Sequence, residues 1–213
     1  MMPLQLQSEV KNGYSSYLSD DKKFLKMDYL NFNNSNDYDD YLDEANSKFG
    51  IYETVEVIHL ITDWINELPR SFRCFTNLVS MDVDGSRFWN LRANQFPSCI
   101  QILIVVSQSN LSSDFFEGCS EDEFPNLKEL HLDGVVWFPY NKQNDSTPPI
   151  PEFKTLEKVF LHFDDLSFED YNSDGERPSP EDHKKFIIQS ALCSQLKIKK
   201  IEVDNEGYIC NIQ

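Results

Sequence analysis

Apolar residues along this chain follow a recurring spacing that is neither the period of an amphipathic helix nor the strict alternation of a strand. An aromatic residue is followed by apolar residues at the third, sixth and eighth positions after it, and six segments in succession fit this template. A seventh segment, Ile198-Ile201-Val203, keeps the spacing without the aromatic residue. The six are Phe24-Met27-Leu30-Phe32, Tyr52-Val55-Ile58-Leu60, Phe75-Leu78-Met81-Val83, Phe96-Cys99-Ile102-Ile104, Phe124-Leu127-Leu130-Leu132 and Phe153-Leu156-Val159-Leu161.

The template predicts a short strand preceded by a turn. Its last two apolar positions are two residues apart, so they face the same side of a strand. One such unit cannot bury its apolar face alone, whereas stacked units can bury it against each other. Most units are 21 to 29 residues apart, which fits one strand and one return segment, and the longer step from Leu156 to Ile198 predicts an insertion. The pattern therefore predicts a repeat array with a parallel sheet.

Two stretches carry a family resemblance. "FPNLKELHLDG", residues 124–134, contains L-x-x-L-x-L as Leu127, Leu130 and Leu132, and residues 60–78 contain Leu68-Pro69 followed by regularly spaced Phe and Leu. This resembles the leucine-rich repeat family. The resemblance implies an α/β solenoid of about seven coils, with a parallel sheet on the concave face and short helices or loops on the convex side. The asparagine that the family places after the strand is absent, so irregular coils are expected.

The same pattern divides the chain into parts of a single repeat domain spanning residues 1–213. We expect residues 1–23 to cap the N-terminal end, 24–163 to form units one to six, 164–185 to hold an acidic insertion, and 186–213 to form the last unit and the C-terminal cap. Proline-rich residues 139–151 and acidic residues 164–182 read as surface insertions.

Two return segments predict helices. "NDYDDYLDEANSKFG" places an apolar stripe on one helical face, with Asn36 as its cap and Gly50 at its end. "SPEDHKKFIIQSALCS" predicts a second helix that begins at Ser179 and Pro180. The stripe of the first helix comprises Tyr38, Tyr41, Leu42, Ala45 and Phe49.

Composition narrows the function. Hydrophobic residues make up 40% of the 213, enough for a core, and the net charge of -17 disfavours binding to nucleic acid. That charge favours a partner protein with a basic surface, although acidic excess also simply keeps proteins soluble. No apolar run reaches membrane-spanning length, and the first ten residues lack the features of a secretory signal. Five cysteines without Cys-x-x-Cys spacing fit a reducing intracellular, cytoplasmic compartment.

Motifs of catalysis are not found in the sequence. It contains no phosphate-binding glycine loop, no His-Glu-x-x-His and no nucleophile elbow, so we expect neither an enzyme nor a cofactor. His131, Asp133 and His162 fall on adjacent predicted strands, where they could share a metal ion. Ordinary polar surface is the simpler interpretation, and no metal site is expected.

The predicted exposed strand positions combine apolar, aromatic, His and Asp side chains, which is typical of a protein-binding face. Alternatively, a neighbouring loop covers the stretch "QILIVV". We expect a non-catalytic interaction module, or scaffold, that binds another protein through the concave face. The alternatives are a structural or assembly subunit of a larger particle and a substrate-recognition adaptor. The expected binding residues are His59, Asp82, Leu103, Val105, His131 and Phe160.

Overall fold

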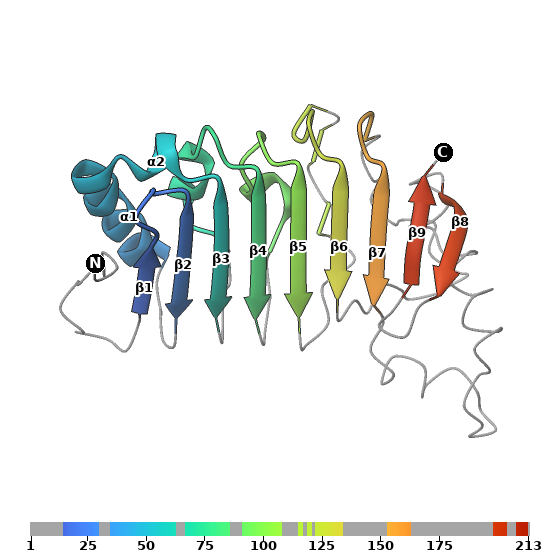
Figure 1. Ribbon diagram of the computed structural model, residues 1–213, viewed down its shortest axis with the longest axis horizontal. Helices are drawn as coiled ribbons and strands as arrows, with labels where there is room; N and C mark the ends of the chain where they lie inside the picture. The colour runs from blue at the N-terminus through green and yellow to red at the C-terminus, as the bar shows by residue number, and fades with distance from the viewer. Residues whose placement is uncertain are drawn as a thin grey trace, which may run out of the picture.

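The computed structural model describes residues 15–29, 35–62, 67–85, 91–107, 115–116, 119–120, 122–133, 153–162, 198–203 and 208–212. They form a nine-stranded sheet in the order β1-β2-β3-β4-β5-β6-β7-β9-β8 (Figure 1). The predicted insertions and the predicted helix from Ser179 lie outside these residues. The strands are β1 Ser15–Leu18, β2 Phe24–Tyr29, β3 Val57–Thr62, β4 Ser80–Gly85, β5 Ile102–Ser107, β6 Glu129–Asp133, β7 Lys158–His162, β8 Ile198–Val203 and β9 Tyr208–Ile212.

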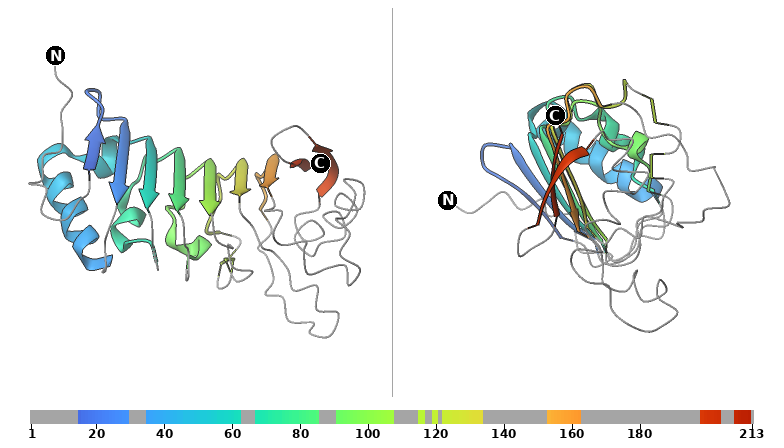
Figure 2. Two further views of the ribbon diagram at one scale, coloured as in Figure 1. Left: turned by 90° about the horizontal axis from the view of Figure 1, so that it is seen from below. Right: turned by 90° about the vertical axis from the view of Figure 1, so that its right-hand side faces the viewer.

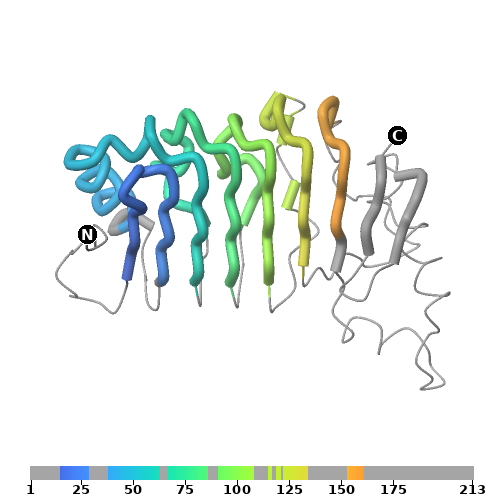
Figure 3. The backbone as a smooth tube through the Cα atoms, viewed as in Figure 1, coloured from blue at the N-terminus to red at the C-terminus, as the bar shows by residue number. Residues whose placement is uncertain are grey.

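Strands β2 to β7 are parallel, and each lies beside the strand that precedes it in the chain (Figure 3). β1 pairs with β2 in the antiparallel sense, and so do β9 with β7 and β8 with β9. The prediction of an α/β fold with a mostly parallel sheet is confirmed. The described helices are α1 Ser35–Phe49, α2 Ile51–Thr54 and the 3₁₀ helices η1 Arg70–Cys74 and η2 Ala93–Gln95.

All the described helices cover one face of the sheet (Figure 2). Alternate strand residues point toward them and are buried in a single core with the return segments. The other residues of β2 to β7 point the opposite way, and we call their side the open face. Its side chains include Lys26, Asp28, Val57, His59, Ile61, Ser80, Asp82, Asp84, Ile102, Ile104, Val106, Glu129, His131, Asp133, Lys158 and Phe160.

Aromatic residues fill the core where the chain turns into each strand. Tyr52 and Phe75 meet edge to face with ring centroids 5.0 Å apart, and Phe116 and Phe153 do so at 5.5 Å. Such pairs contribute roughly 0.5–1.5 kcal/mol beyond their buried area. Edge-to-face contacts between the turns of neighbouring coils therefore account for the aromatic residues Tyr52, Phe75 and Phe153 of the template.

The helix predicted after the first unit is confirmed as α1. Its apolar stripe faces the core, because Tyr38, Leu42 and Ala45 are buried and Tyr41 and Phe49 pack against the same cluster. Gly50 follows the helix with a φ of 68°, a left-handed conformation that glycine adopts without steric penalty. The helix begins at Ser35, one residue before the expected cap.

A repeated backbone hydrogen bond aligns the parallel strands. The carbonyl of Lys23, just before β2, accepts the backbone N–H groups of Glu56 and Val57 at 2.8 and 3.0 Å. The carbonyl of Lys128 accepts those of Glu157 and Lys158 at the same two distances. The pre-strand residues Glu56, Val79 and Gln101 accept two N–H groups in the same way at the three interfaces between them. All five parallel interfaces therefore start in register.

Small side chains in the turns form hydrogen bonds that link one coil to the preceding coil. Asn77 Nδ2 donates to the carbonyl of Glu53 at 2.7 Å, and Thr155 Oγ1 donates to that of Leu127 at 2.8 Å. The Cys99 thiol donates to the carbonyl of Phe75 at 3.1 Å, and burial raises its pKa, so this cysteine stays a thiol. These bonds satisfy carbonyl groups of the turns.

The predicted register of β5 is wrong by one residue. The template placed Cys99, Ile102 and Ile104 in the core, but Ile100, Leu103 and Val105 are buried there. β5 pairs with β4 so that Leu103 lies beside Met81 and Val105 beside Val83. Apolar residues occupy both faces of this strand, so alternation along the sequence could not decide which set faces the core.

Two other predicted units are also wrong. In the first, the strand is β2 with Leu25 and Met27 buried, and Phe24 begins the strand instead of preceding it in a turn. In the last, residues 198–203 do not add a parallel coil. β9 lies between them and β7, and both of its pairings are antiparallel. The parallel run therefore ends at β7.

The corrected register predicts opposite outcomes for two neighbouring residues. Leu103→Ala should lower the free energy of unfolding by about 2–5 kcal/mol, because it removes a fully buried side chain. Ile104→Ala should cost much less, on the order of 1 kcal/mol or below, because Ile104 is on the open face and half-buried. Chemical denaturation measures both. Leu130→Ala, at the position beside Leu103 on β6, is the matched control and should behave like Leu103→Ala. A larger loss at Ile104 than at Leu103 would contradict the register.

Candidate functional site: the open face around β5

An apolar row runs along β5 in the middle of the open face. Ile102, Ile104 and Val106 alternate along the strand, are half-buried, and point away from the helices. We call these three residues the β5 strip. On the neighbouring strands, the positions beside Ile104 are Asp82 of β4 and His131 of β6. The strip is therefore an aliphatic row between two strands that carry ionisable side chains.

The β4 side of the strip carries two carboxylates with little internal compensation. Asp82 Oδ2 lies 3.7 Å from His59 Nε2, and Asp82 Oδ1 is buried with no hydrogen-bond partner among the described residues. Burial raises the pKa of Asp82, the carboxylate of Asp84 raises it further, and His59 and His131 oppose the rise. No basic side chain in the described part of the chain lies within ion-pair distance of Asp84. Ionised Asp82 is thus held where its charge is poorly satisfied.

On the β6 side the carboxylate of Glu129 is paired, whereas His131 Nε2 is buried without a hydrogen-bond partner among the described residues. Glu129 Oε1 accepts a hydrogen bond from Lys158 Nζ at 2.9 Å, and that bond lowers the pKa of Glu129. The ring of His131 stacks on Phe160 with centroids 4.0 Å apart and planes 19° apart. Burial lowers the pKa of His131 and Glu129 opposes the shift, so the imidazole is neutral at pH 7. The β6 and β7 residues therefore present a paired charge and an aromatic stack.

Four of the six predicted binding residues lie on the open face. His59, Asp82, His131 and Phe160 occupy consecutive positions of one row across the sheet, with Ile104 between Asp82 and His131. The expectation that Leu103 and Val105 are exposed is wrong: both are 0% exposed and face the core. The one-residue register error that displaced β5 is the reason.

Sequence reasoning missed the β5 strip itself, although one signal could have located it. Thr62, Gly85 and Ser107 align at the ends of β3, β4 and β5, and all three are buried. Aligning Ser107 with Gly85 in the sequence would have decided which residues of β5 face the core, because this alignment places Leu103 there.

The open face offers binding groups of mixed chemistry. Within the described ranges, no group of three or more His, Cys, Asp or Glu residues is placed to hold a metal ion. The side chain of His162 lies outside the described residues, so the possible cluster with His131 and Asp133 cannot be assembled there. What the face presents is aliphatic surface, a neutral imidazole stacked on a ring, and carboxylates, a combination suited to contacts with another protein.

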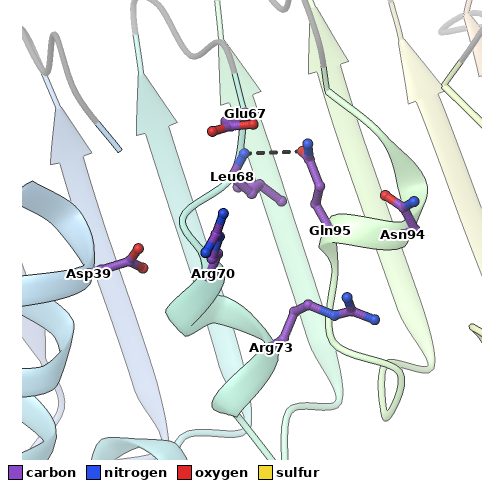
Figure 4. A pocket seen from close by; sticks show the side chains of 7 residues that line it. All are labelled: Asp39, Glu67, Leu68, Arg70, Arg73, Asn94 and Gln95. Atoms are coloured by element: carbon purple, nitrogen blue, oxygen red, sulfur yellow. Dashed lines mark hydrogen bonds between the residues drawn. The ribbon is translucent and has the colours of Figure 1, made fainter. Parts of the chain in front are cut away.

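A polar pocket of about 280 Å³ lies on the other side of the sheet (Figure 4). Two of its four charged residues, Asp39 and Arg73, are engaged in contacts of the fold. Asp39 Oδ1 accepts hydrogen bonds from the backbone N–H and the hydroxyl of Ser71 at 2.8 and 2.6 Å, and Arg73 Nη2 lies 3.2 Å from Glu123 Oε2. Gln95 Oε1 accepts the backbone N–H of Leu68 at 3.1 Å. These contacts join α1, η1 and η2 and indicate a structural role. The lining residues are Asp39, Glu67, Leu68, Arg70, Arg73, Asn94 and Gln95.

None of the helices in the described part of the chain has the length and apolar character needed to cross a membrane.

The raised pKa of Asp82 predicts a pH-dependent stability difference. Since its pKa is higher in the folded than in the unfolded protein, Asp82 favours folding when protonated, and this contribution is lost as pH rises through the folded-state pKa. Asp82→Asn should therefore melt at a higher temperature than the wild type at pH 7. The difference should shrink as pH falls toward the ordinary aspartate pKa. Thermal melts from pH 3 to 8 measure it. Asp20→Asn removes the same charge at an exposed turn and is the matched control. A variant less stable than the wild type at pH 7 would contradict the assignment.

The chain was also compared with known proteins. No protein-family model, curated protein or solved structure matches it. The residues of the open face and their geometry are therefore the basis on which a function is inferred.

Proposed function

We propose that this chain is an irregular solenoid of the leucine-rich repeat type and a non-catalytic interaction module that binds a partner protein through the open face. The observation that carries the proposal is the β5 strip, an aliphatic row at the centre of a sheet face whose described helices all lie on the opposite side. The face would correspond to the concave side that the sequence resemblance implies.

The order of the strands supports the solenoid. Six parallel strands follow one another in chain order, and the described return segments between them contribute to the core on one face only. The double acceptor before each strand repeats at all five parallel interfaces. Within the sheet, each of these strands pairs only with its neighbours, which is the arrangement expected of a solenoid. The variable spacing of the strand starts, at residues 24, 57, 80, 102, 129 and 158, makes it an irregular one.

The chemistry of the face supports a protein partner. Protein-binding surfaces place apolar and aromatic side chains at their centre and polar groups around them. Here Ile104 is central, Phe160 and His131 form an aromatic stack on one side, and Asp82 lies on the other. A partially buried carboxylate with an unsatisfied oxygen is unfavourable in the isolated protein, and a cationic group of a partner would relieve that cost.

Charge and rigidity support the mode of binding. The net charge of -17 accelerates encounter with a basic protein. The β5 strip is carried on a strand paired on both sides, so its geometry exists before the partner arrives. Binding therefore requires little loss of conformational entropy in this protein. Recognition would occur through shape and charge complementarity, without a chemical step.

The test compares capture by three forms of the immobilised protein from a lysate of its native source. The double variant Ile104→Thr with Val106→Thr removes apolar surface from the β5 strip but keeps β-branched residues that suit a strand. It should lose a protein that the wild type retains, with binding weakened about tenfold or more, while its melting temperature stays close to that of the wild type. Quantitative mass spectrometry of the bound proteins measures this.

Tyr17→Thr is the matched control. Tyr17 is a large side chain, 37% exposed, and it pairs with Lys26 at the β1 end of the same face. It lies four strands from β5, so its loss should leave capture unchanged. A partner that both the β5 variant and the control retain equally well would overturn the proposal. It would favour the alternative of an assembly subunit that uses other surfaces.

A further inference from the structure

The backbone of β5 has no hydrogen-bonding capacity left for a partner. β5 pairs along its length with β4 on one side and with β6 on the other. Because β5 has a hydrogen-bonded neighbour on each side, its N–H and C=O groups lie in the plane of the sheet and bond to β4 and β6. An occupant of the β5 strip therefore meets side chains only, and these are aliphatic.

This excludes an extended peptide as a stable occupant. A peptide strand laid on Ile102, Ile104 and Val106 would bury its own N–H and C=O groups against hydrocarbon, and each unpaired buried group is costly. A helix satisfies these groups internally and can present an apolar stripe. Among short segments, the chemistry of the strip therefore selects a helix.

The dimensions of the strip fit a helix lying along β5. Alternate residues on a strand are about 6.6 Å apart, and residues i and i+4 of a helix rise about 6 Å. The six residues of β5 span about 20 Å, which a helix covers in about 13 residues. β4 and β6 are about 9.6 Å apart, close to the diameter of a helix with its side chains. A helix on the strip would thus be flanked by the side chains of β4 and β6.

The two flanks differ in charge. On β6, Glu129 already pairs with Lys158, and His131 is neutral and stacked on Phe160. On β4, Asp82 has a buried oxygen without a hydrogen-bond partner among the described residues, and Asp84 lies two residues further along the same face. Asp133 of β6 lies beside Val106 across the strip from Asp84, and His131 Nε2 is also buried without a hydrogen-bond partner among the described residues. The flanking carboxylate that would gain most from a cation is therefore Asp82 on β4.

We propose that the occupant of the β5 strip is a basic amphipathic helix of the partner protein. Its apolar stripe packs on Ile102, Ile104 and Val106, and its Lys or Arg side chains lie along the flank that faces Asp82 and Asp84. The inference rests on the proposed function and adds to it the secondary structure, the orientation and the charge of the segment that is bound.

The test uses three synthetic peptides of about 18 residues, long enough to cover β5 with a turn to spare at each end. The first is an Ala-rich helix with a Leu stripe and Lys along one side of the stripe. The second replaces each Lys with Glu. The third keeps the Leu and Lys residues of the first but carries two central prolines, which prevent a helix. Fluorescence anisotropy measures the binding of each labelled peptide at 50 and 300 mM NaCl.

We expect the Lys helix to bind and to lose about tenfold or more in affinity at the higher salt concentration, because its charge contacts are screened. The Glu helix and the proline peptide should each bind at least about tenfold more weakly than the Lys helix. Binding of the proline peptide as tight as that of the Lys helix would overturn the helical occupant. Equal binding of the Glu helix would overturn the role of β4.

Protein variants locate the site. Ile104→Thr with Val106→Thr, and separately Asp82→Asn with Asp84→Asn, should each weaken the Lys helix at least about fivefold. Glu44→Gln with Glu53→Gln removes the same charge from exposed positions on α1 and α2 and is the control, which should weaken the Lys helix less than about twofold. Heteronuclear NMR should place the peptide-induced shifts on β4, β5 and β6.

The two proposals fail in different ways. If the captured partner depends on the β5 strip but none of the peptides binds, the helix inference is wrong and the proposed function stands. If the Lys helix binds and neither pair of open-face variants weakens it, the peptide is bound elsewhere and the helix inference is wrong. If neither capture nor peptide binding depends on the open face, both proposals fail.

Discussion

The structure depends on one repeated hydrogen-bond arrangement, the carbonyl before each strand that accepts two backbone N–H groups of the next coil. Because it recurs at every parallel interface, each strand starts level with its neighbour. In a sheet, the residue at which a strand starts also decides which face of the sheet each following side chain points to. The lengths of the return segments vary without disturbing this alignment. Irregular coils can therefore present one continuous core on one side and one continuous open face on the other.

The sequence predicted the register of β3, β4 and β6. In β4 and β6, buried apolar side chains alternate with half-exposed polar or charged ones, so only one register buries the apolar residues. In β3, Val57 and Ile61 are half-exposed and apolar, but the spacing of Ile58 and Leu60 after Tyr52 still placed the strand correctly. α1 was predicted because its stripe, its first turn and Gly50 all indicate the same helix. A helix or strand can be predicted from the sequence when its local hydrophobic pattern agrees with the burial of its residues in the fold.

The errors lie where the pattern allowed two solutions. In β5, residues 102–106 are all aliphatic, so either set of alternate residues could fill the core, and pairing with Met81 and Val83 decides which set does. The same composition makes β5 apolar on both faces of the sheet.

At the C-terminal end, the spacing of residues 198–203 fits a strand, but spacing carries no information about strand direction. β9 pairs with β7 and β8 pairs with β9, a hairpin order that only long-range contacts determine.

The open face around β5 combines aliphatic side chains with a partly buried carboxylate. A soluble sheet face exposed to water is normally polar, yet here an aliphatic strand lies beside a carboxyl group whose pKa is raised by burial. The neighbouring strands show that the sequence can compensate charge within the sheet, because Lys158 holds Glu129 and Phe160 covers His131. Asp82 has no comparably close partner on its neighbouring strands, because His59 of β3 approaches only to 3.7 Å. Uncompensated groups that gather on one face are better explained by a binding partner than by folding, since nothing in the coil alignment requires Asp82 to be acidic or Ile104 to be aliphatic.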